Sequence, residues 1–135
     1  MHLSDREAVA AISLMAMYAD EHVAAEEDAT LRERLCQFPL FEDMPDSELG
    51  GILAQIEQHI RKSGRDAVLA DAIRAIQPWL RPTAFLVAAE VVAADGNVAL
   101  AEHAFLQRLR KEFQLPDDTA SRIFEVTTLR LKRAP

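Results

Sequence analysis

Two segments of this 135-residue chain are apolar on nearly every helical face, and they constrain its fold more than any other feature. The first covers residues 4–19, where the stretch from Ala8 to Ala19 is interrupted by Ser13 alone. The second covers residues 82–94 and is broken by Glu90. Both are too short to span a bilayer, and a helix that is apolar all round belongs inside a bundle. We therefore predict two central helices that are covered on every side.

The other segments have apolar residues at helical spacing on one face, which predicts amphipathic helices around the central pair. They cover residues 24–38, 46–63, 65–76, 99–114 and 117–132. Pro39 and Pro78 end two of them, and Ser4 with Glu7 predicts a capping box before the first central helix. Four glycines and six prolines leave little turn material for an all-β fold. We predict an all-α single domain over residues 1–135 with about seven helices.

Charge and composition exclude several classes of function. A formal charge of −7 argues against an extended nucleic-acid-binding surface. The single cysteine, Cys36, excludes an intrachain disulfide and a cysteine-based zinc site. The sequence has no Gly-rich phosphate loop, no Gly-x-Ser-x-Gly and no His-Glu-x-x-His, so we expect no enzyme. The first residues lack the basic region of a secretory signal, so we expect a cytoplasmic protein.

An internal repeat divides the chain into halves of about 4–63 and 82–132, joined by the helix at 65–76. The aligned positions are Ala19 with Ala94, Asp20 with Asp95, Glu27 with Glu102, and Leu31 with Leu106. A Pro-Asp turn then follows in each half. Because these matches occur in the same order, we predict that the halves superpose through an approximate two-fold axis.

The second half of this repeat resembles the tellurite-resistance TerB-like family. Between Ala84 and Leu115, an apolar helix leads into Ala94-Asp95-Gly96, followed by a glutamate and by leucines at helical spacing. The first half resembles the same pattern more loosely, with Glu21 in place of the glycine. The resemblance implies a compact all-α protein with no established catalysis. It also implies a link to tellurite or other chemical stress, and to metal-linked complexes near the membrane.

Four carboxylates mark the candidate site. Asp20 and Glu27 flank the acidic loop of the first half, and Asp95 and Glu102 flank that of the second. Hard oxygen ligands suit Mg²⁺ or Ca²⁺, although two carboxylates per half would bind such an ion weakly unless the halves converge. The spacing does not fit an EF-hand, which needs acidic residues at loop positions 1, 3 and 5.

A purely structural role for these acids is the alternative. Both following helices would have alanine at the N-cap, Ala24 and Ala99, and alanine offers no side-chain acceptor. A glutamate three residues later still accepts a hydrogen bond from the N-cap N–H and favours the positive helix end. The sequence therefore leaves metal binding and helix capping open for Glu27 and Glu102.

Three further residues invite a functional or a structural interpretation. Glu90 is either a ligand or proton-linked group, or it lies at an exposed edge or pairs with an arginine such as Arg74 or Arg81. His22 lies beside the first acidic loop and is either part of a site or a solvated loop residue. Trp79 is expected to fill the core at the central linker.

Two functions are consistent with these observations. The first is a non-enzymatic stress-response domain that binds partner proteins or senses a weakly bound divalent cation. The second is a plain helical scaffold whose acidic surface docks a basic partner without metal. The expected partners are proteins of a stress-response complex, with or without a membrane nearby, or a second copy of the chain. We expect no nucleic acid among them.

Overall fold

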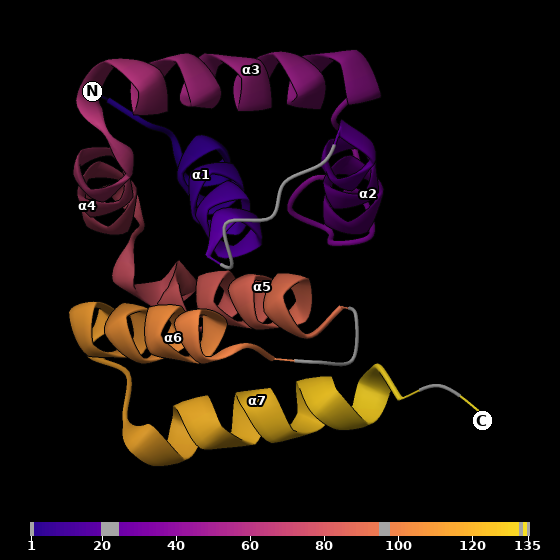
Figure 1. The fold of residues 1–135 in the computed structure, drawn as a ribbon, viewed down its shortest axis with the longest axis vertical. Coiled ribbons are helices and arrows are strands. Elements are labelled where there is room, and N and C mark those ends of the chain that lie inside the picture. The colour runs from indigo at the N-terminus through magenta and orange to yellow at the C-terminus, as the bar shows by residue number, and fades with distance from the viewer. Residues whose placement is uncertain (1, 20–24, 95–97, 133, 135) are drawn as a thin grey trace.

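The computed structural model describes residues 2–19, 25–94, 98–132 and 134, without the side chains of residues 25–28. Over these residues the chain forms seven α-helices, one short 3-10 helix and no strand (Figure 1). The helices are α1 (Asp5–Tyr18), α2 (Ala25–Leu35), α3 (Asp46–Ser63), α4 (Arg65–Ala75), η1 (Pro78–Leu80), α5 (Arg81–Ala93), α6 (Leu100–Phe113) and α7 (Asp117–Arg130). The all-α prediction is confirmed, and every predicted helix is present within a few residues of its expected bounds.

The two apolar helices occupy the centre of the fold, as predicted. In Figure 1, α3 crosses above α1, α4 and α2 stand on either side of it, and α5 lies below. The residues of α1 from Ala8 to Ala16 are all buried without a break. Helix α5 packs against α1 on one side and α7 on another, with α6 also in contact. One hydrophobic core therefore joins all seven described helices.

Local sequence explains how α1 begins. The Ser4 hydroxyl accepts a hydrogen bond from the backbone N–H of Glu7 at 3.2 Å, and the Glu7 carboxylate accepts one from the N–H of Ser4 at 2.9 Å. This reciprocal pair is the predicted capping box, and it satisfies two N–H groups that the helix cannot. The first central helix therefore has a fixed starting point at the surface.

The linker before α5 corrects one prediction. Trp79 does not fill the core, because 70% of its surface is exposed, whereas its neighbour Leu80 is buried. Both residues belong to η1, and successive side chains in a 3-10 helix point about a third of a turn apart. A helix of one turn buries one such residue, and here that residue is Leu80.

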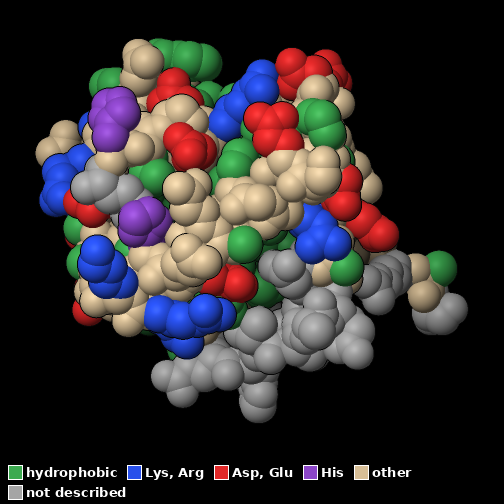
Figure 2. Space-filling view, turned by 90° about the horizontal axis from the view of Figure 1, so that it is seen from above, with side chains coloured by type: hydrophobic (Ala, Val, Ile, Leu, Met, Phe, Trp, Pro, Cys, Tyr) green, Lys and Arg blue, Asp and Glu red, His purple; other side chains and the backbone are tan. Residues whose placement is uncertain are grey.

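The two halves have corresponding contacts, because α1 packs against α2 and α3 while α5 packs against α6 and α7. Superposition of the halves through a two-fold axis stays a prediction. The surface over α3 mixes charges of both signs, and neither forms a continuous field on the face seen in Figure 2. Among the described helices, none combines the length and the apolar character needed to cross a membrane.

Candidate functional site

Glu102 is the predicted site residue whose side chain the structure describes. It lies in the first turn of α6, is 6% exposed, and accepts a hydrogen bond from the backbone N–H of Ala99 at 2.9 Å. Ala99 is the N-cap residue of α6, so this contact is the capping interaction that the sequence left open. The carboxylate also lies at the positive end of the helix dipole, which favours its charge. Glu102 therefore caps α6, and its role as a metal ligand stays a prediction.

The other predicted ligands fall outside the description. Asp20 and Asp95 lie beyond the described residues, as does His22, and Glu27 belongs to α2 without a described side chain. Within the part of the chain that the structure describes, no three His, Cys, Asp or Glu side chains are grouped to hold a metal ion. The four-carboxylate site stays a prediction.

The described flanks of the two acidic segments meet at one pocket of about 270 Å³ between α1, α4 and α6. Ala19, which directly precedes Asp20, lines it from the end of α1. Ala101, which directly precedes Glu102, lines it from the start of α6. Residues far apart in the sequence, one from each half, therefore adjoin the same cavity.

Two guanidinium groups also line this pocket. Arg108 is bonded to Asp66 at 3.0 Å and to Glu112 at 3.3 Å. The hydrogen bond to Asp66 is the main cause that raises the pKa of Arg108, against an opposing effect of burial. Arg65 donates a hydrogen bond to the Tyr18 carbonyl oxygen at 3.3 Å and lies 5.0 Å from the centre of that residue's ring. Asp66 and Glu112 compensate the charge of Arg108, so repulsion of a cation at this pocket comes mainly from Arg65.

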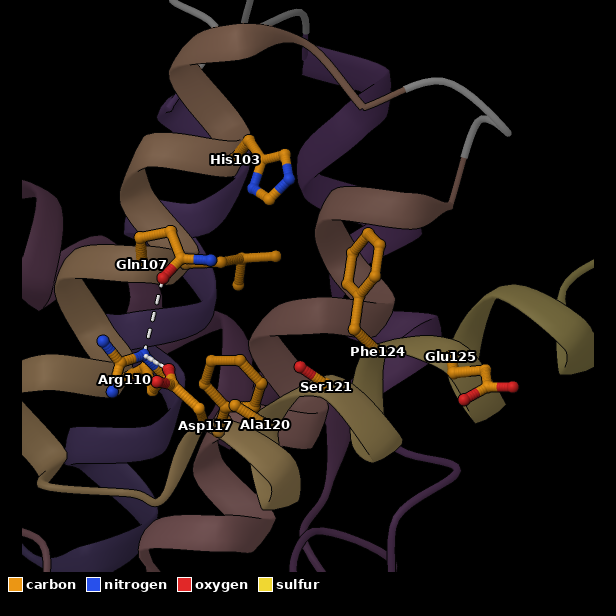
Figure 3. A pocket seen from close by; sticks show the side chains of 10 residues that line it. His103, Gln107, Arg110, Asp117, Ala120, Ser121, Phe124 and Glu125 are labelled. Carbon is orange, nitrogen blue, oxygen red and sulfur yellow. Dashed lines mark hydrogen bonds and ion pairs between the residues drawn. The ribbon is translucent and has the colours of Figure 1, made fainter.

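A second cavity, of about 200 Å³, lies between α6 and α7 over the surface of α5 (Figure 3). The imidazole of His103 on α6 stacks against the ring of Phe124 on α7, with 6.0 Å between ring centres. At the other end, Arg110 is bonded to Asp117 at 3.1 Å and to the carbonyl oxygen of Leu115 at 3.3 Å. Sequence analysis did not find this groove.

The model of the family described as tellurite resistance protein TerB matches residues 6–125, which is nearly the whole chain and includes both pockets. The chain belongs to the TerB family. Comparisons with curated proteins and with solved structures give no match. The resemblance stated from the sequence is thus confirmed for the family and for its helical fold.

Glu90 of this TerB chain is a buried carboxylate, 4% exposed, in the middle of α5. Its partner is Arg130, in the last turn of α7. The expected pairing with an arginine is confirmed, whereas the alternative of an exposed edge and the two arginines suggested as partners were wrong. Arg74 pairs with Asp71 instead, and Arg81 donates a hydrogen bond to the backbone. The α7 ion pair accounts for the burial of Glu90, because a buried carboxylate needs a compensating charge.

Proposed function

We propose that this TerB domain is a non-enzymatic, cytoplasmic module of a chemical-stress response that binds partner proteins and senses a divalent cation. Family membership supports the broad role. The observation that carries the proposal is the pocket between α1, α4 and α6, where Ala19 from one half and Ala101 from the other adjoin the same cavity. Two carboxylates from one half are too few to hold an ion well, so a cation site needs the two halves to lie close together.

In this proposal Asp20, Glu27, Asp95 and Glu102 supply hard oxygen ligands for Mg²⁺ or Ca²⁺. The affinity is low for two reasons: Arg65 repels a cation near the same pocket, and Glu102 already accepts a hydrogen bond from the N-cap N–H. Binding then responds to large changes in ion concentration, which suits a sensor better than a permanent structural site.

Glu102→Gln separates a ligand from a cap. The amide oxygen still accepts the bond from Ala99, so if Glu102 only caps α6, removal of its charge changes the free energy of unfolding by a few tenths of a kcal/mol. For a ligand, the change removes ion binding in calorimetric titrations with Mg²⁺ and Ca²⁺. The wild type gains about 2.7 kcal/mol at an ion concentration 100 times the dissociation constant, and the variant does not.

The control is Glu33→Gln, an exposed change on α2 that removes the same charge. It should leave ion binding intact. A wild-type melting temperature unmoved by millimolar Mg²⁺ and Ca²⁺, together with unchanged stability of Glu102→Gln, would reject the cation part of the proposal.

The metal-free scaffold is the second candidate, and one observation favours it. The chain carries a net charge of −7, and Glu125 at the α6–α7 groove has no hydrogen bond or ion pair within the described residues. Such a surface attracts a basic partner without any ion. Binding that is unchanged in the presence of a chelator supports this candidate, and binding that requires Ca²⁺ or Mg²⁺ supports the sensor.

A further inference from the structure

Contacts between α6 and α7 bound the groove at both ends, and the stacked rings of His103 and Phe124 lie at the end away from the turn. A short turn around Leu115 joins the two helices, and the Arg110–Asp117 ion pair closes the groove beside that turn. Both helices pack mainly on α5 and make little contact with each other. They therefore diverge from the turn and leave part of the α5 surface accessible between them (Figure 3).

The floor of the groove is apolar, and its size fits a single large side chain. Phe85 of α5, Leu106 of α6 and Ala120 of α7 line it and are themselves buried. The stacked rings of His103 and Phe124 form a wall of the same cavity. A volume of about 200 Å³ admits one aromatic or leucine side chain, since roughly 150 Å³ is enough for benzene.

Two exposed leucines lie beyond the stack of His103 and Phe124, one on each helix. Leu100 is 90% exposed and precedes His103 by one helical turn on α6. Leu129 is 57% exposed and follows Glu125 by four residues on α7, so the side chains of Leu129 and Glu125 lie next to each other. The apolar surface of the groove therefore continues outward beyond the cavity.

Polar groups along the groove have unused bonding capacity. The hydroxyl of Ser121 points toward the cavity in Figure 3. Neither the hydroxyl of Ser121 nor the imidazole nitrogens of His103 make a hydrogen bond within the described part of the chain. Among the charged side chains that line the cavity, Arg110 is compensated by its ion pair with Asp117. Glu125 therefore leaves the lining of the cavity with one excess negative charge.

From this combination we propose that the α6–α7 groove docks a basic amphipathic helix of a partner protein. One bulky apolar side chain of that helix fills the cavity, its apolar neighbours cover Leu100 and Leu129, and a lysine or arginine pairs with Glu125. This rests on the proposed function to the extent that the domain binds a protein. A second copy of this chain is a poorer occupant, because two copies with a charge of −7 repel each other.

The test uses two labelled helical peptides with the same pattern of leucines, one carrying lysine and the other glutamate at every polar position. We expect fluorescence anisotropy to show tighter binding of the leucine–lysine peptide. Amide chemical shifts should change along α6 and α7 on the groove side. Equal affinity for the two peptides, no binding of either, or shifts confined to other helices would overturn the proposal.

Two variants of the protein locate the binding. Ser121→Phe fills the cavity from an exposed position and should weaken the leucine–lysine peptide more than tenfold, whereas the matched Ser47→Phe on α3 should not. Glu125→Lys should weaken it about threefold to tenfold, and Glu42→Lys, with the same change in net charge, should have a smaller effect. Wild-type affinity of Ser121→Phe would reject the groove as the docking site.

Further readings separate this proposal from the cation sensor. Peptide binding that survives a chelator and Glu102→Gln but is lost in Ser121→Phe supports docking, even if the ion titrations fail. Ion binding with no peptide binding rejects docking and leaves the sensor intact. If sedimentation shows that the wild type self-associates and Ser121→Phe is monomeric, the occupant is a second copy and the proposed partner helix is wrong.

Discussion

The two central helices, α1 and α5, are both surrounded by other helices, yet they handle their buried polar groups differently. In α1, the hydroxyl of Ser13 donates a hydrogen bond to the carbonyl oxygen of Val9 at 2.8 Å, so the helix satisfies this group by itself. In α5, the carboxylate of Glu90 depends on Arg130 of α7. Burial of α1 thus needs only apolar neighbours, whereas burial of α5 also needs a charge from the last helix.

The N-termini of the two helices show the same contrast, because α1 is capped by its own side chains and α5 is not. Ser4 and Glu7 cap α1, while the N-cap of α5 is Leu80, whose side chain makes no capping hydrogen bond. Pro82 lies in the first turn of α5, where its missing N–H has no helical partner to lose. The first central helix is therefore defined by its own sequence, and the second by the elements that surround it.

The largest expected effect tests how similarly the two helices are packed. Leu31 of α2 lies in the half that contains α1, and Leu106 of α6 lies in the half that contains α5, with 3% and 4% exposure. Each leucine-to-alanine change should cost about 2–5 kcal/mol of unfolding free energy in denaturant titrations. Glu33→Ala, an exposed change, should stay within about 0.5 kcal/mol. If one leucine variant approaches the value of Glu33→Ala, the repeat alignment is wrong.

A smaller effect tests the dependence of α5 on α7. Arg130→Met leaves Glu90 buried without its counter-charge and should cost about 2–3 kcal/mol, less than a fully buried pair because Arg130 is half exposed. The double variant Glu90→Leu with Arg130→Met should recover most of this loss. Arg122→Met, which breaks an exposed pair on the same helix, should be nearly neutral. A loss no greater for Arg130→Met than for Arg122→Met would remove the contrast between the helices.

The smallest effect tests the self-sufficiency of α1. Ser13→Ala removes the hydroxyl together with its hydrogen bond to the Val9 carbonyl oxygen, so no buried donor is left without a partner. Because alanine also favours helix, the free energy of unfolding should change by less than about 0.5 kcal/mol. Ser4→Ala removes the cap and should cost about 1 kcal/mol. Thermal unfolding of both variants gives the comparison. A larger loss for Ser13→Ala would mean that its hydroxyl supports more than α1.

Local patterns were sufficient to predict most of the fold. Ser4 and Glu7 gave the start of α1 because a capping box depends on residues three apart, and Pro39 correctly ended the amphipathic segment before it. The apolar character of residues 8–16 was enough to place α1 at the centre. These features are encoded within a few residues of where they act.

Features that depend on distant residues were predicted less well. The partner of Glu90 comes from forty positions further along the chain, and arginines nearer in sequence were the wrong choice. Trp79 was misplaced because its direction depends on how a single helical turn meets α5. The α6–α7 groove arises from the way two helices pack on α5, and no local sequence pattern encodes that arrangement. Metal binding by the carboxylates around the acidic loops remains a prediction, whereas the capping role of Glu102 is confirmed.

The position of α1 has a consequence for the synthesis of the protein. Helix α1 makes most of its contacts with α4 and α5, which leave the ribosome later than it does. Until they emerge, α2 and α3 cover only part of the apolar stretch at residues 8–16. The core therefore cannot form completely until the second half has been synthesised. Before then, the nascent chain exposes an apolar helix that chaperones can bind.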